Sequence, residues 1–350
     1  MFVHAAPRIR PGVGRALLLP ALGVTLVASM VASVGVGPVN ISPETVIGVV
    51  GAKLGIADPS TWTAAETNIV WLLRLPRVIA GAFVGAALSV AGAVIQALVR
   101  NPLADPYLLG ISSGASAGAA TQILFLSSAA GATALAGSAF LGALLAIALV
   151  FALARTGGQL IPSRLVFAGI AVGFALGALT NLLVFLSNSR DGVRAVLFWM
   201  LGSLGQSRWD TLGLLGLSTV ATFVLLLGWS RRLDAIALGD DTARTLGTHP
   251  IRFRALATAT VALCVAVAVS VSGAIGFVGL VVPHVARRLV GARHRLVLPA
   301  SALIGSLVLI WADALARTAF APAELPLGVL TALLGTPLLI ALVHRMSTAR

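Results

Sequence analysis

Long apolar runs follow one another along the chain, separated by shorter polar segments. A helix needs roughly 20 apolar residues to cross the hydrocarbon core of a bilayer. Strand-like alternation is absent, and backbone polar groups in lipid must be satisfied within their own element, so helices are the expected element. The pattern predicts an all-α polytopic membrane protein, a single transmembrane domain over residues 1–350 with about ten spans. We place these spans at 16–36, 76–99, 107–127, 132–154, 164–187, 210–229, 253–272, 275–290, 296–316 and 325–345.

The composition supports a membrane location. Hydrophobic residues make up 58% of the chain and charged residues 10%, whereas soluble domains are about 45–50% apolar and about 25% charged. The formal charge of +13 comes from short basic clusters between apolar runs, not from a basic stripe on one face. This distribution argues against nucleic-acid binding. Such clusters instead set the orientation of a membrane protein.

Counting the basic residues in alternating connections predicts the orientation. With a cytoplasmic start, 17 of the 24 Lys and Arg residues fall on the inner side. Because Lys and Arg are retained in cytoplasmic loops, both termini are expected inside, beginning with a short cytoplasmic tail over residues 1–15. The seven on the outer side are Lys53, Arg74, Arg77, Arg190, Arg194, Arg208 and Arg317.

Several spans contain glycines at four-residue spacing, which puts a smooth stripe on one face of a helix and lets two backbones approach closely. This pattern fits close bundle packing, and it also fits a helix that lines a moving path, so both interpretations stay open. The two main rows are Gly110, Gly114 and Gly118, and Gly169, Gly173 and Gly177.

The inner connection over residues 230–252 is too polar to span the membrane. It contains a short predicted helix from Asp240 to Leu246, whose acidic first turn suits the helix dipole and which Gly247 is placed to end. Another inner connection begins Asn101-Pro102 and contains Pro106, which predicts a reversal of the chain.

No residue pattern for covalent chemistry stands out. The only lysine, Lys53, lies between Ala52 and Leu54, so the chain has no Walker phosphate-binding loop. The single Cys264 excludes an intrachain disulfide and a cysteine-based metal site. We expect no cofactor, no metal site and no enzymatic activity in this chain. Any uphill transport would draw on a partner subunit or an ion gradient. The one deep carboxylate, Asp313, is expected to pair with Arg317 one helical turn away.

Four segments together resemble FecCD-type permeases, the membrane subunits of ABC importers for ferric siderophores, haem and cobalamin. They are residues 74–118, which begin RLPR, residues 237–247, which read ALGDDTARTLG, and residues 272–318 and 324–343. The resemblance implies ten helices in the cytoplasmic membrane of a bacterium. It also implies a second permease subunit, identical or related, two cytoplasmic ATP-binding subunits and an extracytoplasmic substrate-binding protein.

The same resemblance implies roles for particular residues. It makes Arg74, Arg77 and Arg317 the contacts for the substrate-binding protein. It makes the segment after residue 237 a coupling helix that docks on the ATPase, with the residues Leu238, Gly239, Asp240, Asp241, Ala243, Arg244, Leu246 and Gly247. The resulting hypothesis is an alternating-access importer of an iron chelate, with a ferric siderophore favoured. Haem or cobalamin on the same scaffold is an alternative, and an ion-coupled carrier without an ATPase is an alternative of another class.

Overall fold

The computed structural model describes residues 14–58, 62–126, 131–156, 159–160 and 162–347. The predicted tail over residues 1–15 lies almost entirely outside these residues. The elements are α1 (Gly14–Gly35), α2 (Pro43–Lys53), α3 (Ala64–Asn68), the π-helix η2 (Ile69–Arg74), α4 (Leu75–Val99), the 3₁₀-helix η3 (Pro106–Leu109), α5 (Ile111–Phe125), α6 (Gly131–Ala154), β1 (Arg155–Thr156), β2 (Gln159–Leu160), α7 (Pro162–Leu186), α8 (Arg190–Met200), α9 (Trp209–Gly228), α10 (Ser230–Leu238), α11 (Asp240–Thr245), α12 (Pro250–Ser272), α13 (Val278–Val290), α14 (His294–Thr318) and α15 (Leu327–Ser347).

The predicted all-α membrane fold is confirmed, and β1 and β2 add only a hairpin of two-residue strands between α6 and α7. Among the described residues, seven helical segments are long and apolar enough to cross a membrane. The predicted spans 107–127 and 275–290 correspond to the shorter helices α5 and α13, and the predicted span 325–345 corresponds to α15. Helix α5 begins later than predicted because residues 106–109 form η3, which ends at Gly110 with a positive φ. Helix α13 begins only at Val278, after a non-helical stretch.

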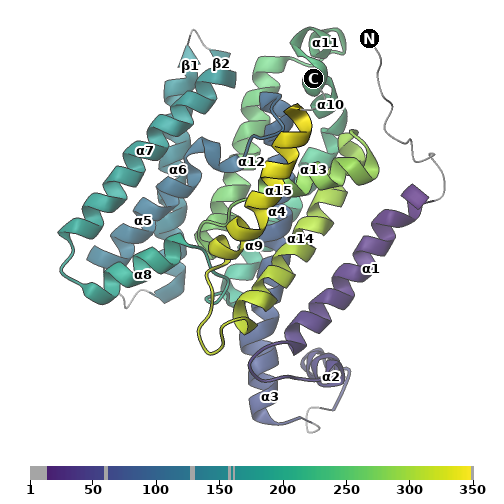
Figure 1. Cartoon of the computed structure of the whole chain (residues 1–350), viewed down its shortest axis with the longest axis vertical. Coiled ribbons are helices and arrows are strands. Elements are labelled where there is room, and N and C mark those ends of the chain that lie inside the picture. Colours follow the sequence, from purple (N-terminus) through teal and green to yellow (C-terminus); the bar gives the residue numbers. More distant parts are fainter. Residues whose placement is uncertain (1–13, 59–61, 127–130, 157–158, 161, 348–350) are drawn as a thin grey trace.

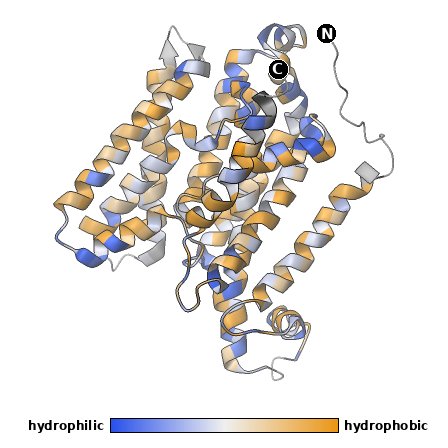
Figure 2. Cartoon of the chain, viewed as in Figure 1, coloured by the Kyte–Doolittle hydropathy of each residue, from blue (hydrophilic) through white to orange (hydrophobic). Residues whose placement is uncertain are grey.

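Helix α4 lies at the centre of the bundle and is buried along most of its length. It packs against α14, α12, α13 and α9, and α3, η2 and α4 run on as one apolar helical segment from Ala64 to Val99. The prediction began this span at residue 76 and therefore missed its first three turns. Helices α1, α6 and α7 consist mostly of apolar residues (Figure 2), and many of their large apolar side chains are exposed, as expected for helices surrounded by lipid.

The bundle has two distinct ends (Figure 1). We call the end with α2, α3, α8 and the α14–α15 connection the α2 end. The opposite end, with α10, α11 and the β1–β2 hairpin, is the α11 end. Helix α1 begins and helix α15 ends toward the α11 end.

Two connections contain helices that the apolar pattern did not predict. Helices α2 and α3 lie in the predicted connection over residues 37–75, and α8 follows α7. All three begin with a side-chain cap, in which Ser42, Thr63 or Ser189 accepts a hydrogen bond from a backbone N–H of the first turn. They are too short to span a bilayer, so a search for 20-residue apolar runs passes over them.

Candidate functional site

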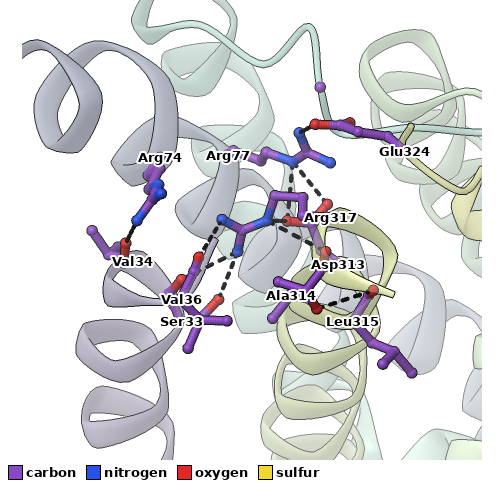
Figure 3. A network of polar contacts seen from close by, with 12 residues as sticks. Ser33, Val34, Val36, Arg74, Arg77, Asp313, Ala314, Leu315, Arg317 and Glu324 are labelled. Atoms are coloured by element: carbon purple, nitrogen blue, oxygen red, sulfur yellow. Dashed lines mark hydrogen bonds and ion pairs between the residues drawn. The ribbon is translucent and has the colours of Figure 1, made fainter. Parts of the chain in front are cut away.

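Three arginines predicted on the outer side gather at the α2 end (Figure 3). Arg74 ends η2, Arg77 lies in the first turn of α4, and Arg317 lies in the last turn of α14. All three are buried. Their guanidinium groups are therefore engaged within the chain, and their part in docking a partner stays a prediction.

Two of these arginines cap the end of α1. Arg74 Nη1 donates to the carbonyl oxygens of Val34 and Gly35 at 2.9 and 3.0 Å. Arg317 donates from Nη1 to the Val36 carbonyl at 3.0 Å and from Nη2 to the Ser33 carbonyl at 3.2 Å. The last carbonyls of a helix lack partners within the helix and carry partial negative charge, so guanidinium groups satisfy them well. This capping gives a structural role to two arginines at the end that the balance of basic residues predicts to face outward.

Arg77 and Arg317 share the carboxylate of Asp313. Arg77 Nε donates to both Asp313 oxygens, at 2.9 and 3.0 Å, and Arg317 Nε lies 3.0 Å from Asp313 Oδ2. The predicted ion pair within α14 is thus confirmed. The second partner, Arg77 on α4, was missed because it is 236 positions away in the sequence. Arg77 Nη1 also donates to Glu324 Oε1 at 3.0 Å, from the connection between α14 and α15.

A cleft of about 990 Å³ opens at the α2 end beside this group. All three arginines line it, together with Glu324 and the exposed residues Arg208 and Asp210 at the start of α9. The cleft thus presents four guanidinium groups and two carboxylates along its wall. A partner that offers acidic side chains fits this charge balance better than one that offers basic side chains.

At the α11 end, the predicted short helix is present as α11. Gly239, with a φ of 127°, separates it from α10, and Gly247, with a φ of 76°, follows its end. Leu238 and Leu246, on either side of α11, are 72% and 65% exposed. The remaining residues of the segment divide between the two faces: Asp241 and Arg244 are exposed and form an ion pair of 2.8 Å, while Ala243 is buried. This segment offers a partner two apolar side chains beside a charged pair.

Asp240 ties α11 to the bundle through Arg254 of α12. Arg254 Nη2 and Nη1 donate to the two Asp240 oxygens at 2.8 and 3.1 Å, and Arg254 Nε donates to the Leu98 carbonyl near the end of α4 at 2.9 Å. The hydrogen bond from Arg254 lowers the pKa of the Asp240 carboxyl, so this carboxylate stays ionised at neutral pH. Sequence reasoning gave Arg254 no role, because no local pattern indicates a partner on another helix.

The two glycine rows differ in their surroundings. A side chain at Gly114 or Gly118 would run into backbone of α6, at the carbonyls of Gly142 and Ser138 respectively. A side chain at Gly169 would meet the Leu108 carbonyl, whereas a Cβ at Gly177 would have no neighbour within 4 Å. The row from Gly110 to Gly118 therefore serves close packing of helices. The row from Gly169 to Gly177 is packed at Gly169 but not at Gly177.

A second cleft, of about 520 Å³, joins members of both rows. Gly110, Gly169 and Gly173 line it together with Asp105 and Tyr107. The Tyr107 hydroxyl donates to the Ile275 carbonyl at 3.1 Å and accepts from the Ile275 N–H at 3.0 Å, which fixes the non-helical stretch before α13. The cleft thus lies where η3, α7 and α13 meet.

Comparison with known proteins defines the class. A family model described as the FecCD transport family matches residues 25–345. The hemin transport system permease protein HmuU of Yersinia pestis is 39% identical, over 85% of this chain and 90% of its own. The cobalamin import system permease protein BtuC of Halobacterium salinarum is 36% identical, over 93% and 95%. The Fe(3+)-citrate import system permease protein YfmD of Bacillus subtilis is 38% identical, over 80% and 82%.

A solved structure supports the same conclusion. An inward-facing structure of an ABC transporter assigned to the metal-chelate type superposes with a TM-score of 0.82 at 31% identity, covering 94% of this chain and 99% of the other. Fold and relatives together define a membrane permease of the ABC importer class, a transport subunit and not an enzyme. The chain belongs to the FecCD transport family.

Proposed function

We propose that this chain is the membrane subunit of a binding-protein-dependent ABC importer that carries an iron chelate into a bacterial cell, with a ferric siderophore as the favoured cargo. The observation that carries the proposal is that the two ends of the bundle, in a chain of this family, have different surfaces. The α2 end has an arginine-lined cleft, and the α11 end has a short helix flanked by exposed leucines. One end suits an acidic binding protein, and the other suits the groove of a separate ATPase.

The mechanism follows from this division. Loaded binding protein docks at the α2 end through a surface that includes Arg74, Arg77 and Arg317. Two ATP-binding subunits engage the segment from Leu238 to Gly247 on each of two permease subunits. Their closure and opening move that segment as a rigid body and expose the path to one side of the membrane at a time. This chain supplies the path, and the ATPase supplies the energy.

Iron is favoured as part of the cargo because two of the compared permeases are named for an iron compound, hemin and ferric citrate. Cobalamin is the cargo in the name of the third. The cargo is identified by measuring uptake of ferric siderophore, hemin and cobalamin by the same transporter.

The test is uptake into proteoliposomes that contain the permease with its ATPase partner and internal ATP, facing loaded binding protein. We expect uphill accumulation of ferric siderophore that stops when ATP or the ATPase is left out. Uptake of hemin or cobalamin alone would replace the proposed cargo and keep the class. Uphill accumulation in vesicles that hold the permease without any ATPase would contradict the class itself.

A further inference from the structure

Glu324 is much more exposed than the buried charged residues around it, which are Arg74, Arg77, Arg317 and Asp313. The Asp313 side chain is 2% exposed and is held by two guanidinium groups. The Glu324 side chain is 42% exposed and is held by one contact, from Arg77 Nη1 at 3.0 Å. An ion pair with a solvent-exposed partner adds little stability, whereas breaking a buried pair leaves an uncompensated charge. Glu324 is therefore the exchangeable partner of Arg77, and Asp313 is the permanent one.

The position of Glu324 also suits exchange. It lies in the connection between α14 and α15 and reaches across to α4, so its side chain bridges elements that are far apart in the sequence (Figure 3). The chain just after it is fixed separately: the Leu325 N–H donates to the Ala316 carbonyl, and the Leu327 N–H donates to the Gly202 carbonyl. Losing the contact to Arg77 would therefore free the Glu324 side chain without undoing the start of α15.

The surroundings hold room for a second carboxylate. Arg77 and Glu324 both line the cleft at the α2 end, and a Cβ on Gly205 would lie 3.5 Å from Arg77 Nη1 and also 3.5 Å from a Glu324 carboxylate oxygen. The missing side chain at Gly205 thus keeps the approach to this ion pair open. Arg74, Arg77 and Arg317 face two internal carboxylates, and only one without Glu324.

We propose that Glu324 occupies the place of a carboxylate of the docking protein. In the resting permease Glu324 neutralises the Arg77 Nη1 position. On docking, an Asp or Glu of the substrate-binding protein takes over this contact, and Glu324 turns into solvent. The inference rests on the proposed function and adds to it a specific step, the exchange of one carboxylate for another. Glu324 thereby competes with the docking protein for Arg77 and weakens docking.

The test uses the substrate-binding protein that supports uptake in the experiment above and the complete permease–ATPase complex in nanodiscs. Glu324→Gln keeps the shape of the side chain and removes its charge. We expect its Kd for loaded binding protein to fall about five- to tenfold, with a faster association rate that fades at high salt. Asp191→Asn is the matched control, because Asp191 is an exposed carboxylate on α8 at the same end of the bundle and does not line the cleft.

A second measurement reads the exchange itself. In a Cys264→Ala background, a spin label at Ala323→Cys reports the mobility of the chain next to Glu324. We expect docking to raise this mobility when Glu324 is present and to leave it unchanged in Glu324→Gln. An unchanged or higher Kd for Glu324→Gln, or equal tightening by Asp191→Asn, would overturn the exchange while leaving the proposed function standing. Absence of any binding to the unaltered complex would overturn both.

Discussion

Asp105 lies between α4 and α5, where its side chain is half-buried and accepts a hydrogen bond from the Tyr107 N–H at 2.8 Å. Burial raises the pKa of this carboxyl from 3.8 to about 6, and the hydrogen bond opposes the rise only in part. The native state therefore binds this proton more tightly than the unfolded state does. Stability falls as pH increases from about 4 to about 6 and stays lower above that range.

Replacing Asp105 by Asn removes this penalty and keeps the acceptor for the Tyr107 N–H. We expect Asp105→Asn to stabilise the protein at pH 8 by about 2 kcal/mol, and the gain to vanish toward pH 4. The measurement is the thermal unfolding midpoint in detergent across this pH range. Asp191→Asn, at a side chain that is 97% exposed, serves as the control. A lower midpoint for Asp105→Asn at pH 8 would contradict this account.

At the scale of the element, glycine spacing is informative only together with the neighbouring helix. Gly114 and Gly118 on α5 face the backbone of α6, and Gly177 at the far end of the row on α7 faces open space. Both rows have the same four-residue spacing, so the sequence predicted a smooth stripe in each case but could not assign a partner to either. The partner depends on how distant helices dock, which no local pattern encodes.

These surroundings predict opposite effects of one substitution. Gly118→Ala forces α5 away from Ser138 on α6 and is expected to cost about 1–3 kcal/mol of stability, as overpacking does. Gly177→Ala has free space and gains helix propensity, so it is expected to be neutral or stabilising by up to about 1 kcal/mol. Thermal unfolding midpoints of the two variants check this difference. Equal effects at both positions would mean that α5 and α6 are not packed as closely as described.

For the candidate sites, the sequence predicted the features that depend on residues close together in the chain but not the contacts between distant residues. The segment around α11, the reversal after Asn101 and the Asp313–Arg317 pair depend on residues within a few positions of each other, and all three are present. The contacts of Arg77 with Asp313 and of Arg254 with Asp240 join different helices, so they became visible only in the folded chain. The capping of α1 by Arg74 and Arg317 belongs to the same class.

For the whole molecule, the balance of basic residues predicts that the α11 end faces the cytoplasm. Leu54 at the α2 end and Leu246 at the α11 end are 64% and 65% exposed, which makes them a matched pair for labelling. The native Cys264 is buried and can be replaced by Ala to leave a single reporter. In intact spheroplasts we expect a membrane-impermeant maleimide to label Leu54→Cys and spare Leu246→Cys, and inside-out vesicles to show the reverse. Labelling of Leu246→Cys from outside would invert the orientation.

Helix α4 touches both candidate sites. Arg77 stands near its first residue and Leu98, whose carbonyl accepts from Arg254, near its last, and the rise from residue 77 to residue 98 is about 32 Å. A helix of this length resists compression along its axis. A displacement of Arg254 that shifts one end of α4 is therefore expected to move Arg77 at the other end, by tilting or sliding the whole helix. In the proposed importer, α4 would therefore link movement at the end where the ATPase docks to movement at the end where the loaded binding protein docks.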